Sequence, residues 1–501
     1  MGTASTRPVL RSDLAAAAQA LLQNGYRLAA ITGCHDEGGL RAVYTFAGPG
    51  RVDELVVSMP LDDARVPSMA ALSYPAGRFE REVHDMFGIE PVGHPLPQRL
   101  VLHGHWPQGW HPMRHDEPVP PHVAEDIGSF PFLEVEGTGV YEIPVGPVHA
   151  GLIEPGHFRF SVVGETILRM KARLWFVHRG IEKLFEGEPV EAAIPLAERV
   201  SGDTAVGHTL ALLTAIEDAA GLVVDERARR VRAVLLELER MYNHVADLGA
   251  LATDVGFGIA GVHAQRLRER LLRLNRTVTG HRLLRGGLFL GGARLLALPS
   301  AAEIASVATE IEELAEVTLG QPVVLDRFTG TAVLTREQAE QLGTLGYVAR
   351  ASGLDADARR DHPLTDLGPR FEVITESGGD VLARYRVRRR EAAVSAAVIT
   401  DLLGELASSG WGSSAGSPVT VPAVAERLGP PRSGVALVEG WRGTICHRVE
   451  LRPDGRLSRV RIVDPSFLNW PALPVALADT IVPDFPLANK SFNQSYAGND
   501  L

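Results

Sequence analysis

The sequence predicts an α+β protein in which a small α+β N-terminal domain is joined by a proline-rich arm to a mainly helical large domain with peripheral β-strands. Three observations predict this fold: period-two alternation in the first 90 residues, nine prolines between Pro91 and Pro131, and long stretches of helical periodicity beyond residue 200. A chain of 501 residues with 45% hydrophobic residues can bury two cores. We therefore assign residues 1–135 to the first domain with its arm and residues 136–501 to the second.

The first 90 residues contain one predicted helix and two predicted strands. The helix spans Ser12 to Asn24, and alternating apolar residues predict strands at Arg41 to Phe46 and Glu54 to Ser58. The proline density that follows is typical of an extended, ordered arm, because proline lacks the N–H that a helix or an inner strand requires.

The second domain should begin with strands and continue as helices. The stretches 141–160 and 161–176 are rich in β-forming residues, and apolar residues at i, i+3, i+4 and i+7 predict helices at 203–220, 225–253, 261–280, 301–319 and 335–351. The basic run from Arg384 to Arg390 is interpreted as a solvated or subunit-facing strand edge. The Gly/Ser patch 408–417 is predicted to be a loop.

Composition narrows the classes of function. A net charge of −11 argues against a nucleic-acid-binding protein. No apolar run of about 18 residues is free of charge, since even Val245 to Val262 contains Asp247 and Asp254, so we expect no membrane-spanning segment. The N-terminus has no signal-peptide pattern and the chain has two cysteines, Cys34 and Cys446, which indicates a cytoplasmic, reducing setting.

A continuous motif lies near the end of the first domain. Residues 77–88 read GRFEREVHDMFG, and they are followed by Gly93-His94-Pro95 and then Arg99-Leu100. Taken alone, the segment is an amphipathic helix that ends at a glycine. The motif resembles the signature of the small quinone-module subunit of complex I.

A second series of motifs runs from residue 146 to the C-terminus. The large domain resembles the large subunit of the same module and, more closely, the large subunit of formate-hydrogenlyase-type, energy-converting nickel-iron hydrogenases. The matching runs are GPVH at 146–149, EPGHFR at 154–159, HRGIEK at 178–183, ERV at 198–200, DHP at 361–363 and NWP at 469–471. Together the two resemblances cover nearly the whole chain, in the order of a fusion of the two subunits.

The sequence departs from the hydrogenases at the metal ligands. The resemblance implies four thiolates from two C-x-x-C motifs, because soft sulfur ligands suit nickel and iron. Ser201 and Thr204 stand at the first pair of positions, and Ser495 and Gly498 stand at the second. We therefore expect no metal in this chain and no nickel-iron centre.

The resemblance implies a quinone pocket where the metal would have been, between the loop 146–159 and the helix beginning near Ser201, closed by the C-terminal tail. Glu154 and His157 are the expected catalytic proton donors, and His149, His157, Asp361 and His362 are the expected pocket residues. A structural hydrogen bond to backbone is the alternative role of each histidine. The tyrosine that holds the quinone in complex I falls at Val190, which puts ordinary ubiquinone reduction in doubt.

Arg179 and Glu182 belong to a motif that, in the resembling families, packs against the partner that carries an iron-sulfur cluster. We expect both residues at this partner interface, and the alternative is an i,i+3 ion pair on a helix surface.

The resemblance implies one subunit of a membrane-associated oxidoreductase of the NADH:quinone type, which passes electrons toward a quinone-like acceptor and is not itself a hydrogenase. We expect no cofactor bound by this chain, quinone as substrate, an iron-sulfur cluster in a small partner subunit, and NAD only through the assembled complex. The expected partners also include antiporter-like and anchor membrane subunits, with the chain on the cytoplasmic face of the inner or plasma membrane. The alternative function is a non-catalytic subunit that couples its partners structurally.

Overall fold

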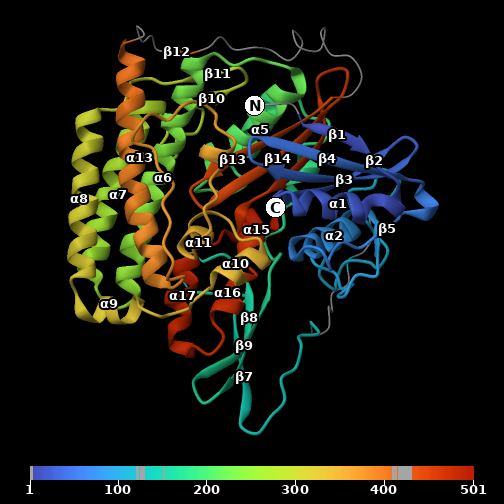
Figure 1. The fold of residues 1–501 in the computed structure, drawn as a ribbon, viewed down its shortest axis with the longest axis horizontal. Helices are drawn as coiled ribbons and strands as arrows, with labels where there is room; N and C mark the ends of the chain where they lie inside the picture. Colours follow the sequence, from blue (N-terminus) through green and yellow to red (C-terminus); the bar gives the residue numbers. More distant parts are fainter. Residues whose placement is uncertain (1–3, 120–122, 124–129, 151–152, 409–413, 416–431) are drawn as a thin grey trace.

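The computed structural model describes residues 4–119, 123, 130–150, 153–408, 414–415 and 432–501. Figure 1 shows a small sheet domain beside a larger body that ends in a bundle of long helices. The predicted α+β class, with a small N-terminal domain and a mainly helical large domain, is confirmed. None of the described helices is both long enough and apolar enough to cross a membrane.

The N-terminal domain is a four-stranded sheet with helices packed on it. The strands lie in the order β1-β4-β3-β2, in which β1 is parallel to β4 and the other pairs are antiparallel. The predicted helix and both predicted strands are confirmed, with slightly different ends. The elements are β1 (Ser5–Pro8), η1 (Arg11–Asp13), α1 (Leu14–Gln23), β2 (Arg27–Asp36), β3 (Gly39–Gly48), β4 (Arg51–Met59), η2 (Leu61–Asp63), β5 (Arg65–Pro67), α2 (Tyr74–Phe87) and β6 (Glu90–Val92).

Helix α2 contains the complex I-like motif. It ends where predicted, because Gly88 adopts a left-handed conformation (φ +73°) and its N–H donates to the carbonyl of His84. A side chain at this position would also collide with the His111 ring of the arm, at 2.8 Å. Gly88 therefore lets the arm pack closely against the end of α2.

A three-stranded antiparallel sheet follows the arm, in the order β7-β8-β9. Its strands are β7 (Val140–Val145), β8 (His157–Val163) and β9 (Thr166–Arg173). The domain boundary placed at residue 135 falls between β6 and β7, where the described residues form neither helix nor strand.

The large domain combines a helical bundle with a second antiparallel sheet. The helices α6, α7, α8 and α13 form the bundle, and α5 packs on the sheet of β13, β14 and β15 (Figure 1). The helices are α3 (Ile181–Leu184), α4 (Val190–Ala197), α5 (Ala205–Ala220), α6 (Glu226–Asp254), α7 (Gly258–Thr279), α8 (Ala301–Leu319), α9 (Pro322–Phe328), α10 (Arg336–Leu342), α11 (Gly346–Ala351), α12 (Ala358–Asp361), α13 (Val381–Ser408), α15 (Pro465–Asn469), α16 (Ala472–Ala476), η3 (Val482–Asp484), α17 (Phe485–Phe492) and α18 (Tyr496–Asp500). The remaining strands are β10 (Leu288–Phe289), β11 (Gly292–Arg294), β12 (Ser414–Ala415), β13 (Arg432–Gly440), β14 (Gly443–Leu451) and β15 (Leu457–Val463).

Two predictions in this domain are wrong. The helix predicted at 335–351 is two helices, because Gly343 ends α10 in a left-handed conformation (φ +70°). The run Arg384 to Arg390 is not a strand edge but part of α13, where Arg384 and Arg388 are fully buried. Arg388 is neutralised by Asp247 at 2.9 Å, so the helix buries charges that the sequence pattern assigned to solvent. The Gly/Ser patch predicted as a loop lies mostly outside the described residues.

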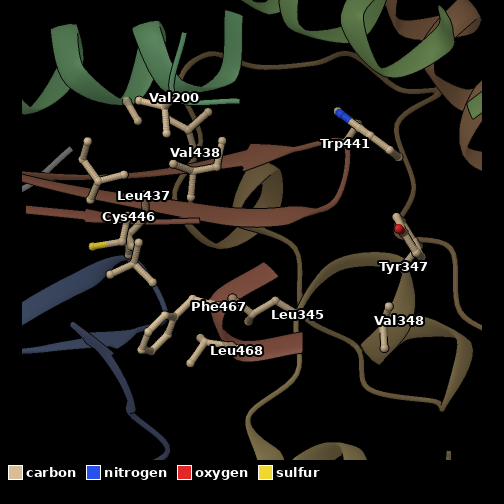
Figure 2. Packing of buried hydrophobic residues seen from close by; sticks show 14 of the residues in the cluster. Val200, Leu345, Tyr347, Val348, Leu437, Val438, Trp441, Cys446, Phe467 and Leu468 are labelled. Atoms are coloured by element: carbon tan, nitrogen blue, oxygen red, sulfur yellow. The ribbon is translucent and has the colours of Figure 1, made fainter. Parts of the chain in front are cut away.

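The hydrophobic core is continuous between the two domains. Figure 2 shows Leu437, Val438 and Cys446 of the second sheet near Val200. Strands β14 and β15 of this sheet also contact β2 of the N-terminal sheet. The two domains therefore pack directly against each other.

Candidate functional site

A cavity of about 420 Å³ lies where the resemblance placed the lost metal centre. Three chain segments line it: Ile153 and Glu154 before β8, the turn 201–203 before α5, and the C-terminal segment 489–497 with Arg442. The turn is placed by α4 and α5, whose buried faces fix its two ends. The cavity thus joins residues that are about 300 positions apart in the sequence.

The four positions that the resemblance assigns to thiolates lie close together, and two of them, Ser201 and Ser495, line this cavity. The Ser201 and Ser495 hydroxyls are hydrogen-bonded at 2.8 Å, and the Gly498 N–H donates to the Ser495 hydroxyl at 2.8 Å. Gly498 has no room for a side chain, because a Cβ there would lie 2.6 Å from the Asp464 carboxyl carbon. Thr204 accepts a hydrogen bond from the Trp441 indole at 3.1 Å.

An ion pair sits beside these hydroxyls. The Arg442 guanidinium donates two hydrogen bonds of 2.7 Å to the two carboxylate oxygens of Asp203, which also accepts from the Ser201 and Thr204 hydroxyls at 3.0 Å. Burial raises the pKa of Asp203, but the charge of Arg442 and the hydrogen bonds outweigh it and hold that pKa at about 2. Asp203 is therefore ionised at neutral pH, and the pair leaves little net charge at the cavity.

These residues do not fit a nickel-iron centre. Hydroxyls and a carboxylate already paired with a guanidinium are poor ligands for a soft metal site. Burial raises the pKa of both Cys34 and Cys446 to about 12, and each lies in a strand away from the cavity lining. The described residues contain no group of three or more His, Cys, Asp or Glu side chains placed to hold a metal ion.

Glu154 lines the cavity, as expected, and its carboxylate accepts the Ala497 N–H at 3.0 Å. The cavity also contains a residue that the sequence reasoning missed: Tyr496. Its ring packs edge-on against Trp470 at 4.9 Å, and burial raises its pKa to about 12, so the phenol keeps its proton at neutral pH. The sequence could have indicated Tyr496, because it directly follows Ser495, which the resemblance assigns to a ligand position.

The expected placement of the two histidines at the cavity is wrong, because neither lines it. His149 is hydrogen-bonded to the Gly156 carbonyl at 2.8 Å, and His157 to the Gly146 carbonyl at 3.2 Å. His157 also stacks on Phe132, with ring centres 5.4 Å apart, and burial lowers its pKa. Both histidines thus make the structural backbone contact that was the alternative role.

Asp361 and His362 also lie elsewhere. The Asp361 carbonyl accepts the Gly50 N–H of the N-terminal domain at 2.9 Å. His362 lines a separate small cavity together with Glu237 and Glu439. These two residues help to hold the domains together, and the expected pocket-rim placement is wrong because the turn packs on the N-terminal sheet.

Arg179 and Glu182 both make contacts inside the chain. The Arg179 guanidinium donates to three backbone carbonyls, those of Arg199, Val200 and Ala497, and so ties the turn before α5 to the C-terminal helix. The Glu182 carboxylate is buried and binds Arg461 at 3.0 Å and Arg459 at 2.6 Å. The expectation of a partner-facing Glu182 is therefore corrected, since its carboxylate is already neutralised within the chain.

The fold and this site define a class of protein: a small complex I-type domain fused to a hydrogenase-like large domain. Comparison with protein families agrees. Residues 8–123 match the family "Respiratory-chain NADH dehydrogenase, 30 Kd subunit", and residues 254–500 match "Respiratory-chain NADH dehydrogenase, 49 Kd subunit".

Several curated proteins are similar to much of this chain. Formate hydrogenlyase subunit 5 of Escherichia coli strain K12 is 34% identical over 84% of this chain and 74% of its own length. The fused C/D polypeptide of NADH-quinone oxidoreductase from Phocaeicola vulgatus is 30% identical over 83% of this chain and 84% of its own length. The carbon monoxide-induced hydrogenase of Rhodospirillum rubrum is 30% identical over 70% of this chain and 97% of its own length.

The chain belongs to this family, in which the 30 Kd and 49 Kd subunits of complex I are fused and which includes formate-hydrogenlyase-type hydrogenase components. Among solved structures, a chain of the membrane-bound sulfane sulfur reductase, described as an archaeal respiratory membrane complex, shares the fold of part of this chain. It aligns with a TM-score of 0.65 and 24% identity over 72% of this chain and 99% of that chain.

Proposed function

We propose that this chain is the acceptor-binding subunit of a membrane-associated oxidoreductase and is not a hydrogenase. An iron-sulfur cluster in a small partner subunit would deliver electrons to a quinone-like acceptor in the cavity of Ser201 and Ser495. NAD would take part only if the assembled complex also has a module that oxidises it. The relatives support a role in an oxidoreductase complex, since their names include NADH-quinone oxidoreductase and formate hydrogenlyase subunits.

One observation carries the proposal. Ser201 and Ser495, at two of the four positions that the resemblance assigns to thiolates, line a cavity, and Thr204 and Gly498 lie beside them, so hydroxyls and a glycine stand where sulfur is expected. A volume of about 420 Å³ lies within the range of roughly 300–1,000 Å³ that is usual for small-molecule pockets. The cavity can therefore hold an organic ring in place of a metal.

The cavity also supplies the groups that quinone reduction needs. Two electrons and two protons convert a quinone to a hydroquinone, so each carbonyl oxygen must gain one proton. The Tyr496 phenol stays protonated at neutral pH, and Lys490 and Glu154 also line the cavity. Tyr496 offers a hydrogen-bond donor in place of the tyrosine that the resemblance to complex I puts at Val190.

The assembly would attach to a membrane through partner subunits. The relatives include complex I and hydrogenase subunits, and the fold matches a chain of a respiratory membrane complex. We propose antiporter-like and anchor subunits as membrane partners, with this chain on the cytoplasmic face. The ion that such a complex would move is a property of those partners.

Glu154→Gln and Tyr496→Phe test the proposal in membranes that contain the assembled complex. Each variant should slow quinone reduction by about 10² to 10⁴, the usual contribution of a positioned acid or base. His157→Ala is the matched control, because His157 does not line the cavity and its loss should leave the rate nearly unchanged. Wild-type rates in both cavity variants would contradict the proposal.

A second function, that of a non-catalytic element that couples its partners, is favoured by one observation. The Ser201 and Ser495 hydroxyls are hydrogen-bonded to each other, and Arg442 forms an ion pair with Asp203. These polar groups of the cavity therefore need no ligand to complete their interactions. In this case the cavity variants would assemble and transfer electrons at the full rate, whereas loss of the chain would dissociate the complex.

A further inference from the structure

A second, larger cleft lies outside the site described above. It has a volume of about 890 Å³ and shares no lining residue with the cavity of Ser201. Its lining residues come from helix α2, strand β9, the segments 96–100 and 130–135, and residues 470–478, which include α16. The cleft is therefore built jointly by the N-terminal domain and the large domain.

Four arginines line this cleft, Arg78, Arg81, Arg169 and Arg173, and none of them has a carboxylate partner in the part of the chain that the structure describes. Arg173, which is only 6% exposed, donates to the carbonyls of Leu100 and Leu102, and its buried Nε has no acceptor. Arg78 lies over the Phe467 ring at 4.7 Å, and its Nε and one terminal nitrogen have no acceptor. Arg81 donates only to backbone carbonyls.

The nearest carboxyl groups do not neutralise these arginines. Asp85 accepts three backbone N–H groups from the arm, and Asp500 accepts the Val177 N–H. Burial raises the pKa of Asp85 and raises that of Asp500 to about 6, while burial lowers the pKa of Arg81 and of Arg173 to about 10. The cleft therefore holds excess positive charge in a protein whose net charge is −11.

The wall of the cleft is the open edge of a strand. Strand β9 is the last strand of its sheet, and six consecutive residues, from Leu168 to Arg173, line the cleft. Successive side chains of a strand point to opposite faces, so consecutive lining residues mean that the edge faces the space. Beyond β8, no backbone hydrogen bond to this stretch occurs among the described residues.

The opposite walls are apolar and aromatic. Phe130, Trp175 and Trp470 line the cleft, and the Arg173 guanidinium lies 4.7 Å from the Phe130 ring. Aromatic rings next to a cation are suited to a chain that alternates apolar and acidic side chains, because one side of it is apolar and the other carries charge.

We propose that this cleft docks an extended segment of a partner subunit, which adds a strand to the edge of β9 and places a carboxylate between Arg78 and Arg173. The inference rests on the proposed function only in requiring that the chain works in a complex of several subunits. Strand addition satisfies the free backbone groups of β9, and the carboxylate satisfies the free guanidinium nitrogens. A lipid phosphate could neutralise the arginines but would leave the strand edge unpaired, so the peptide is favoured.

The test uses the assembled complex, purified through a tag on the full-length chain. A photo-crosslinking amino acid replaces Ala172, which is exposed and lies within the β9 edge, and the matched control replaces the exposed Ala393 of α13. Mass spectrometry should find position 172 linked to an Asp- or Glu-containing peptide of one co-purifying subunit. Position 393 should not give that product.

The arginines are then removed by the double change Arg78→Gln and Arg173→Gln, with Arg386→Gln on the exposed side of α13 as the control. The yield of the 172 cross-link should fall about tenfold or more, as expected for losing charge-assisted hydrogen bonds. Lysine at both positions should restore part of the yield, since it keeps the charge, and unfolding midpoints of the purified chains check the fold.

The outcomes separate the two proposals. Cross-links from position 172 only to lipid or to this chain itself, in an intact complex, would overturn the docking inference and leave the proposed function standing. A yield that is unchanged by the arginine variants would also overturn it. A chain that purifies with no partner at all would overturn both.

Discussion

Two sets of arginines lie at the boundary between the domains, and they differ in whether they form an ion pair with a carboxylate. Arg448 and Arg461 are buried in the large-domain sheet and reach across to Glu54 and Glu82 of the N-terminal domain, at 2.7 and 2.5 Å. Arg78 and Arg173 are found at the same boundary, but face a cleft and have no such partner among the described residues. Both sets are largely removed from water.

The difference separates structural charges from charges available to a ligand. A buried ion pair is self-sufficient, and breaking one partner away is costly because the other charge stays buried. An arginine held by backbone carbonyls and aromatic rings keeps most of its charge uncompensated, which favours an anion supplied from outside. Arg448 and Arg461 therefore hold the two domains together, whereas Arg78 and Arg173 remain available to bind a partner.

The largest effect should come from Arg461→Leu. The Arg461 guanidinium lies 2.5 Å from Glu82 and 3.0 Å from Glu182, so its removal leaves Glu82 buried without a cation and leaves Glu182 with Arg459 alone. We expect a loss of about 3–5 kcal/mol in the free energy of unfolding, measured by denaturant titration of the purified chain. Arg386→Leu, at an exposed position, should stay within about 0.5 kcal/mol of wild type. Equal losses in the two variants would show that the ion pair between the domains does not stabilise the folded chain.

Much of the fold could be predicted from the sequence because its local signals are strong. Periodicity located α5 to α8, and Gly88 marked the end of α2. The prediction of a solvent-exposed strand edge at Arg384 to Arg390 was wrong for a physical reason. The charge pattern alone indicated solvent exposure, but inside the bundle Ser491 accepts a hydrogen bond from Arg384 and Asp247 pairs with Arg388. Burial of a charge depends on partners that are distant in sequence.

The site was predictable only in part for the same reason. The resemblance assigned Ser201, Thr204, Ser495 and Gly498 to ligand positions, and hydrogen bonds join Ser201, Ser495 and Gly498 in the structure. The motif histidines were misplaced because a motif gives a residue's type but not the direction of its side chain, and His149 and His157 turn to backbone carbonyls. The cleft of Arg78 and Arg173 could not be foreseen, because it needs residues from both domains.

Glu239 gives the reverse case of the unpaired arginines, because this buried carboxyl has no ion-pair partner among the residues that the structure describes. Glu239 is buried behind the turn at Ser201, accepts the Val206 and Gly207 N–H groups, and burial raises its pKa to about 8. Its folded-state pKa lies above the unfolded value, so the folded chain binds more protons, and its stabilising effect is lost as pH rises through the interval from about 4.5 to 8.

Glu239→Gln should flatten that dependence. Wild type should lose stability between pH 5 and pH 8 with a contribution from Glu239 of up to about 1.4 kcal/mol per pH unit, and the variant should lack this contribution. Unfolding midpoints measured across the interval give the slope. Asp218→Asn, which changes another largely buried carboxyl, is the comparison variant, and its slope should stay closer to wild type. Identical slopes for wild type and Glu239→Gln would contradict the raised pKa.

The smallest effect should come from Arg78→Met in the isolated chain. Removing this arginine leaves no carboxylate stranded, because Arg78 has no ion-pair partner among the described residues, and methionine can fill the space over the Phe467 ring. The loss should be about 0.5–1 kcal/mol, the usual contribution of a cation–π contact, against several times that for Arg461→Leu. The same variant should nevertheless weaken partner retention in the assembled complex. A loss of stability as large as that of Arg461→Leu would mean that Arg78 is structural, because only a hidden carboxylate partner within the chain could make its removal so costly.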